Sequence, residues 1–133
     1  MSFVIDASIA ACWVFRDEEH HVADFALKRL AEEDAIVPSL WWFELRNVLI
    51  TNERRKRITQ SDSAAFLSSL ARLEIGLDRT PQESEVLRLA RTHRLSVYDS
   101  AYLELALRRA IPLATLDGDL IRAAKAEGVV MLG

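Results

Sequence analysis

The stretch "LSVYDSAYLELALRRAIPLATLDGDL", residues 95–120, combines a helical pattern with a short apolar segment. Its spacing predicts a helix over residues 98–110 and a strand over residues 111–116. Asp99 lies in the first turn of that helix, and Asp117 directly follows that strand. A carboxylate next to apolar chain must be solvated, cap a helix, pair with a base or bind a cation. The rest of the sequence has to distinguish among these roles.

The alternation of strands and helices continues on both sides of this stretch. The other predicted strands cover residues 2–5, 35–38, 74–78 and 129–132. The predicted helices begin near residues 8, 20, 39, 59, 80, 98 and 118. Because helices occupy the connections, the sheet should be mostly parallel and covered on both faces. We therefore expect a single α/β domain over residues 1–133, with three layers and a mostly parallel central sheet of about five strands flanked by helices.

Capping patterns predict where several helices begin. Thr59 is a plausible cap for the helix that follows it, and "TPQE" places Thr80 as a cap, Pro81 at the first helical position and Glu83 in a capping box. The helix within residues 20–34 should bury one apolar stripe, made of Val22, Phe25, Ala26 and Leu30.

Composition excludes several classes of protein. The 133 residues carry 17 Lys and Arg against 20 Asp and Glu, a net charge of −3, which argues against sequence-blind wrapping of nucleic acid. An acidic metal site within a basic surface would remain compatible with a nucleic-acid enzyme. The single cysteine, Cys12, cannot form an internal disulfide. No apolar run reaches the roughly 20 residues of a membrane span, and acidic residues 17–19 follow the run at 9–15. We expect a cytoplasmic protein that does not engage a membrane.

Four carboxylates lie at the ends of predicted elements, although each also has a structural explanation. Asp6 and Asp117 follow strands and could cap the next helix, and Ser96 with Asp99 fits an S-x-x-D capping pattern. Glu44 lies within "LWWFEL" and lacks such a local role. In open parallel sheets, ligands bind at the carboxyl ends of strands, where these acids would meet.

The order of these motifs along the chain indicates a family. "DAS" follows the first strand, a glutamate lies on a mid-chain helix, "YDSAY" begins a late helix, and a T-x-D-x-x-L pattern ends the stretch at residue 120. The whole chain resembles a PIN domain, and in particular the VapC-type ribonuclease toxins of prokaryotic toxin–antitoxin pairs. The resemblance implies endonucleolytic cleavage of single-stranded or loop RNA, a homodimer, and a small antitoxin that blocks the acidic groove.

The resemblance also assigns the site residues. The family's four catalytic acids correspond, in chain order, to Asp6, Glu44, Asp99 and Asp117. Supporting polar positions correspond to Ser8, Asn47 and Thr115. Asn47 could equally be a plain amide on the helix surface. Asp119 could share or replace the role of Asp117, but only Asp117 keeps the T-x-D-x-x-L register.

Clustered carboxylates raise one another's pKa unless a cation neutralises them. All-oxygen ligation suits Mg²⁺, for which Mn²⁺ can substitute, and such an ion orients and deprotonates a water for phosphodiester hydrolysis. We expect Asp6 and Asp99 to be direct ligands. Glu44 would act through water or position the attacking water, and Asp117 would bind a second metal or lie in the outer shell.

Other interpretations of the sequence remain open. The basic run at residues 54–57 could bind RNA or simply carry the charges of a helix end. Trp41, Trp42 and Phe43 could stack on bases or receive an antitoxin helix, but at least one should pack in the core. The protein could instead be a catalytically silent binding partner with the same fold. "LDGDL" is also similar to the D-x-D motif of aspartate-based phosphatases.

Overall fold

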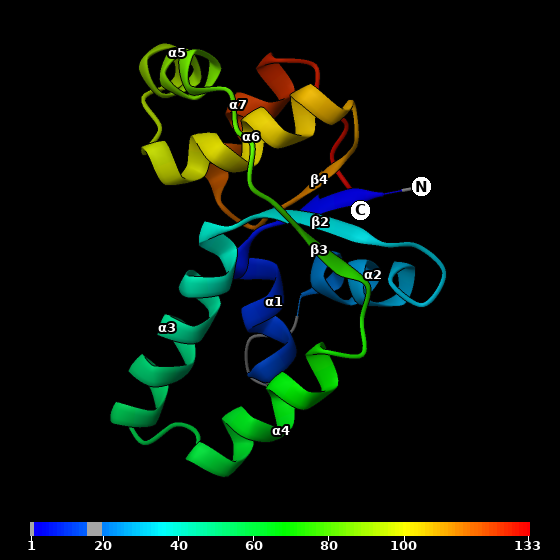
Figure 1. The fold of residues 1–133 in the computed structure, drawn as a ribbon, viewed down its shortest axis with the longest axis vertical. Helices are drawn as coiled ribbons and strands as arrows, with labels where there is room; N and C mark the ends of the chain where they lie inside the picture. Colours follow the sequence, from blue (N-terminus) through cyan, green and yellow to red (C-terminus); the bar gives the residue numbers. More distant parts are fainter. Residues whose placement is uncertain (1, 16–19) are drawn as a thin grey trace.

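The computed structural model describes residues 2–15 and 20–133. The acidic residues Asp17, Glu18 and Glu19 lie outside the described residues. In the described part of the chain, four parallel strands form one sheet in the order β3-β2-β1-β4 (Figure 1). The strands are β1 (Phe3–Ile5), β2 (Ala35–Pro38), β3 (Ile75–Asp78) and β4 (Leu113–Ala114).

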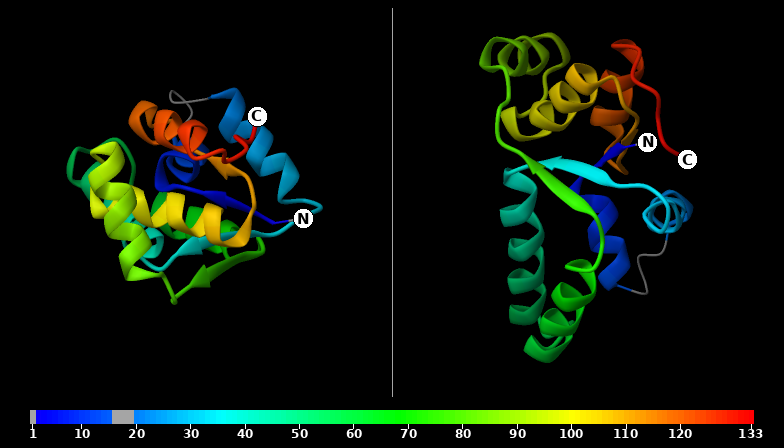
Figure 2. Two further views of the ribbon diagram at one scale, coloured as in Figure 1. Left: turned by 90° about the horizontal axis from the view of Figure 1, so that it is seen from above. Right: turned by 45° about the vertical axis from the view of Figure 1, so that its right-hand side comes forward.

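Helices occupy every connection between the strands. The connecting helices are α1 (Ala7–Val14), α2 (His21–Arg29), α3 (Leu40–Arg54), α4 (Gln60–Leu70), α5 (Glu83–His93) and α6 (Val97–Arg109), and α7 (Gly118–Ala126) follows β4. Figures 1 and 2 show α1 to α4 on one side of the sheet and α5 to α7 on the other. The expected three-layer α/β architecture is therefore confirmed.

The centre of the sheet is apolar on both faces. Phe3, Val4 and Ile5 of β1 are fully buried, as expected for a parallel strand covered by helices on each side. Val4 pairs with Ile36 of β2 and with Leu113 of β4, so β1 is an interior strand. A single core surrounds this strand and holds the strand ends in fixed positions.

The prediction of about five strands is wrong by one. The segment expected as a final strand, residues 129–132, makes a single bridge between Met131 and Leu113. Its partner β4 is only two residues long, so the two segments cannot build a ladder.

Two local predictions also fail, each because a different contact replaces the expected one. The Thr80 hydroxyl donates to Asp78 Oδ1 at 3.4 Å, and α5 begins at Glu83 after Gln82 as the N-cap. Phe25 is 42% exposed rather than buried, and the Arg29 guanidinium lies 5.7 Å from the centre of its ring.

Other helix starts are confirmed. The Thr59 hydroxyl accepts from the Asp62 amide, and the Asp62 carboxylate accepts from the Thr59 amide, which completes a capping box. Ser96 caps α6 through the amide of Asp99. Among the helices of the described residues, none combines the length and apolar character needed to cross a membrane.

Candidate functional site

The site lies where the chain reverses its direction across the sheet. The order β3-β2-β1-β4 makes β1 and β4 neighbours, although the chain visits β2 and β3 between them. Asp6 directly follows β1, and Asp117 lies three residues after β4. Ligands in open parallel sheets bind at such a switch point, beyond the carboxyl ends of the strands.

Asp6 is the most constrained of the four predicted acids. It is 6% exposed, and its Oδ1 accepts from the Ser8 hydroxyl at 2.5 Å and from the Ile9 amide at 3.3 Å. Its Oδ2 accepts from the Thr115 hydroxyl. Burial raises the pKa of Asp6 above its usual value, although these hydrogen bonds act in the opposite direction. Asp6 also caps α1, so its predicted structural role is real.

Two hydroxyl groups connect the ends of β1 and β4. The Ser8 Oγ, besides donating to Asp6, accepts from the Leu116 amide at 3.1 Å. The Thr115 Oγ1 similarly accepts from the Asp117 amide at 3.0 Å. Both predicted supporting hydroxyls therefore contact Asp6 while they hold the backbone that leads to Asp117.

Glu44 reaches the site from the second turn of α3. Its carboxylate is partly buried, and its Oε1 accepts a hydrogen bond from the Tyr102 hydroxyl at 2.5 Å. Burial raises the pKa of Glu44, and the negative charge of Asp6 raises it further, whereas the Tyr102 hydrogen bond lowers it. Tyr102 was not predicted from the sequence, because its partner is 58 residues away along the chain.

The pKa of Asp99 depends on the charges of the three other acids, so the four acids share one electrostatic environment. This pKa is raised to about 6, first by burial and then by the charge of Asp117 and a hydrogen bond with it. The charges of Asp6 and Glu44 raise this pKa further. Acids from four different elements therefore lie within reach of one another. Strongly perturbed carboxylates of this kind are typical of functional sites.

The two remaining candidates, Asp119 and Asn47, are both exposed. Asp119 is exposed and forms an ion pair with Arg122 at 2.8 Å. Asp117, by contrast, is the neighbouring charge that raises the pKa of Asp99 the most. Its side chain also caps α7. Asn47 lies exposed on α3, so its interpretation as a surface amide stays open.

Comparison with known proteins identifies the family. A family model described as the PIN domain matches residues 3–126. The chain belongs to the PIN domain family. This PIN domain is 30% identical over 124 residues to Ribonuclease VapC3 of Pyrobaculum aerophilum, an alignment that covers 90% of this chain and 92% of that protein.

Solved structures show the same fold at lower sequence identity. PAE2754 from Pyrobaculum aerophilum has a TM-score of 0.73 at 22% identity, with 98% of this PIN domain and 92% of that chain covered. A chain of VapBC2 from Rickettsia felis, solved bound to a DNA fragment from its promoter, has a TM-score of 0.69 at 14% identity, with 98% and 97% covered. At these identities the likeness establishes the fold alone.

The donor set of this PIN domain fits a hard divalent cation. Among the described residues, no three His, Cys, Asp or Glu side chains are already arranged as a metal-binding group. Mg²⁺, however, needs only one or two direct carboxylates and keeps several waters. Burial raises the pKa of Asp6, and burial together with neighbouring negative charges raises the pKa values of Glu44 and Asp99, so a cation would favour the ionised form of all three. We therefore consider the chemistry compatible with Mg²⁺ or Mn²⁺.

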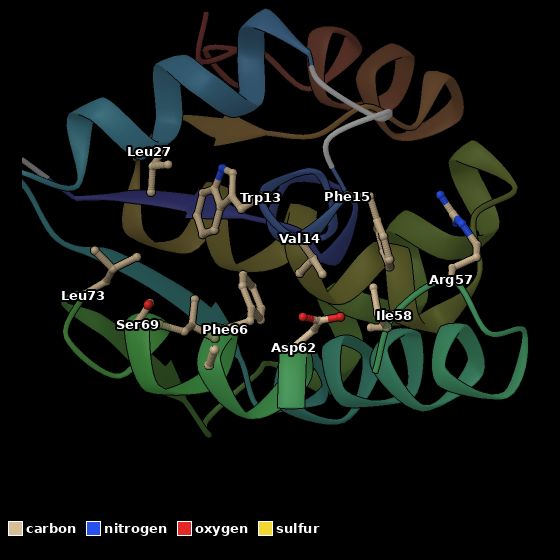
Figure 3. Close-up of a pocket in the computed structure, with 12 residues that line it drawn as sticks. Trp13, Val14, Phe15, Leu27, Arg57, Ile58, Asp62, Phe66, Ser69 and Leu73 are labelled. Carbon is tan, nitrogen blue, oxygen red and sulfur yellow. The ribbon is translucent and has the colours of Figure 1, made fainter. Parts of the chain in front are cut away.

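A separate apolar cavity of about 930 Å³ lies between α1, α2 and α4 (Figure 3). Trp13, Phe15 and Phe66 line it, and none of the four acids does. Asp62 is the one carboxylate that lines it, together with Arg57 and Ser69, so the wall offers no cluster of acids for metal chemistry. This cavity is therefore a candidate surface for a partner rather than for catalysis.

Proposed function

We propose that this PIN domain is a metal-dependent endoribonuclease and the toxin component of a toxin–antitoxin pair. The observation that carries the proposal is the convergence of four acids at the switch point of the sheet, with the pKa of Asp99 raised to about 6. The relative from Pyrobaculum aerophilum is named a ribonuclease, which supports RNA as the substrate.

In this proposal Asp6 and Asp99 hold Mg²⁺ or Mn²⁺ directly, and Asp117 contributes from the outer shell or holds a second ion. A bound ion of this kind lowers the pKa of a water and stabilises charge on the phosphate oxygens. Asp6 Oδ2 accepts one described hydrogen bond, so it retains a lone pair for an ion. The Ser8 and Thr115 hydroxyls fix the Asp6 carboxylate in advance.

Glu44 is proposed to orient the attacking water and to accept its proton. Its carboxylate is partly buried and its pKa is raised, so it is a stronger base than a solvated glutamate. The hydrogen bond from Tyr102 leaves Oε2 of Glu44 to interact with water. This division of roles requires no covalent intermediate between the protein and RNA.

The RNA is proposed to lie against the exposed start of α3. Trp41 packs in the core, as expected for one of the three adjacent aromatics, whereas Trp42 and Phe43 are exposed, Phe43 by 69%. The Arg46 guanidinium lies 4.1 Å from the centre of the Trp42 ring. An aromatic side chain beside a guanidinium suits a base and its phosphate.

We also propose that the protein forms a homodimer, as the sequence analysis expects.

An antitoxin is the proposed protein partner. The Rickettsia felis neighbour was solved as VapBC2, bound to promoter DNA. The apolar cavity between α1, α2 and α4 would bury one face of an amphipathic helix from such a partner. A second segment of the partner would then reach the acids at the switch point and block them.

A catalytically silent binding partner is the second candidate. The lack of a ready-made three-ligand metal group among the described residues favours it. An aspartate-based phosphatase has less support, because its attacking aspartate follows the first strand of that fold. Here the D-x-D pair follows β4, where Asp117 caps α7 and Asp119 pairs with Arg122.

The decisive experiment incubates the purified, antitoxin-free protein with total cellular RNA in Mg²⁺, in Mn²⁺ and in chelator. We expect discrete metal-dependent cuts that Asp99→Asn abolishes. Asp24→Asn is the matched control, because Asp24 is exposed in the first turn of α2. Metal binding without cleavage would favour the silent partner, and cleavage retained in Asp99→Asn would refute the proposed site.

A further inference from the structure

A buried phenol connects two of the elements that carry the acids. Tyr102 of α6 is 1% exposed, and its hydroxyl lies 2.5 Å from Glu44 Oε1 of α3. The two residues are 58 positions apart, so the contact exists only in the folded protein. It places a hydrogen-bond donor behind the carboxylate of a proposed catalytic acid.

The position of Tyr102 on α6 makes this contact specific to the site. Asp99 lies three residues earlier on the same helix, and residues three apart lie on neighbouring parts of one helix face. One turn of α6 therefore supplies both an acid of the site and the group that holds a second acid. The hydrogen bond therefore connects Glu44 of α3 to the helical turn that carries Asp99.

We infer that Tyr102 is a positioning residue that holds the Glu44 carboxylate in its working orientation. The inference rests on the proposed function and deepens it. Glutamate has three side-chain torsions, and a partly buried carboxylate on a long side chain adopts several rotamers unless a contact selects one. The Tyr102 ring is locked in the core, so its hydroxyl is a fixed reference point for Oε1.

The substitution Tyr102→Phe separates this role from packing. It removes only the hydroxyl and keeps the buried ring, so the core around α6 stays filled. Without this hydrogen bond to a charged group, the Glu44 carboxylate would no longer be held in its working orientation. We therefore expect Tyr102→Phe to lower kcat by about 10- to 100-fold. KM for RNA should remain the same, because Tyr102 is too buried to contact a substrate.

The chain offers a matched control on the same helix. Tyr98 is exposed in the first turn of α6, and Tyr98→Phe removes the same hydroxyl from a solvated ring. We expect Tyr98→Phe to retain kcat. A merely structural role for Tyr102 would lower the urea midpoint of Tyr102→Phe and leave kcat unchanged in the folded protein.

The test is a double-mutant cycle with Glu44→Gln, read as cleavage of a fluorescent RNA oligonucleotide chosen from the sites that the wild type cuts. We expect Tyr102→Phe to reduce kcat in the wild type and to have no further effect in Glu44→Gln. An equal loss in both backgrounds, or no loss in either, overturns the inference. A crystal structure of Tyr102→Phe gives a second, activity-independent measurement, in which Glu44 should leave its present rotamer. If the wild type does not cleave RNA, the proposed function fails, and an unmoved Glu44 in that crystal structure separately refutes the positioning role.

Discussion

The Thr115 hydroxyl at the end of β4 donates a hydrogen bond to Oδ2 of Asp6 at the end of β1, although the two residues are 109 positions apart. The same oxygen of Thr115 accepts from the Asp117 amide. One hydroxyl group therefore orients a buried carboxylate and the backbone of a second acid. This arrangement makes Thr115 a sensitive position for both stability and the proposed activity.

Thr115→Val should destabilise the protein by about 1–3 kcal/mol, because it leaves the buried Asp6 carboxylate without one of its donors. Urea unfolding at neutral pH measures this change. Thr115→Ser is the control, since it keeps the hydroxyl and should retain most of the stability. If the valine and serine variants unfold at the same urea concentration, the hydroxyl contributes nothing.

Asp99→Asn should stabilise the metal-free protein above pH 6. The pKa of Asp99 is raised from 3.8 to about 6, so the folded state binds a proton more tightly than the unfolded chain. The corresponding contribution to stability is present below about pH 4 and is lost as the pH rises through about 6. Urea midpoints measured with chelator from pH 4 to 8 should therefore fall more for the wild type than for Asp99→Asn. Parallel curves for the two proteins would contradict this prediction.

Two substitutions at Asp117 distinguish its capping role from its charge. Asn caps a helix as well as Asp does, so Asp117→Asn should keep the stability but lose metal-dependent cleavage. Asp117→Ala should also lose about 1 kcal/mol of stability.

Asp119→Asn should retain most of the activity, because Asp119 is exposed and paired with Arg122. RNA cleavage and urea unfolding of all three variants test this, and a greater loss of activity in Asp119→Asn would make Asp119 the fourth acid.

Arg108 lies in the last turn of α6, at the other end of this helix from Asp99, and contacts two buried carboxylates. It lies 2.6 Å from Asp78 at the end of β3 and 2.7 Å from Glu104 on its own helix. Arg108→Met should cost roughly 3 kcal/mol, because both carboxylates lose this charged partner. Arg109→Met is the control, as Arg109 is 51% exposed and lies 3.8 Å from Asp78. Differential scanning calorimetry should show a large decrease in Tm for the first variant and little for the second.

Local patterns were sufficient to predict much of this fold. Thr59 and Ser96 cap helices as expected, and the strand at residues 35–38 ends at Pro38. The errors arose where another contact competes with the expected local signal. Thr80 bonds to Asp78 instead of capping α5, and the predicted last strand meets a partner only two residues long.

Three of the candidate acids, Asp6, Asp99 and Asp117, stand out in the sequence because they follow strands or begin helices, whereas Glu44 was assigned through the family resemblance. The partners of these acids were not predictable, since nothing near Tyr102 in the sequence indicates a contact with Glu44. The same holds for Arg108 and Asp78, which are 30 positions apart. The apolar cavity was also missed, because its walls come from α1, α2, α4 and the loop before α4, and α1 and α4 lie far apart in the chain.

The strand order has a consequence for how the protein is synthesised. Because β4 lies beside β1, the first strand of the sheet lacks one neighbour until residues 113–114 have been translated. A chain that has been synthesised only as far as Asp99 lacks both Thr115 and Asp117. The complete acidic site therefore cannot assemble before residues 113–117 have joined the sheet beside β1.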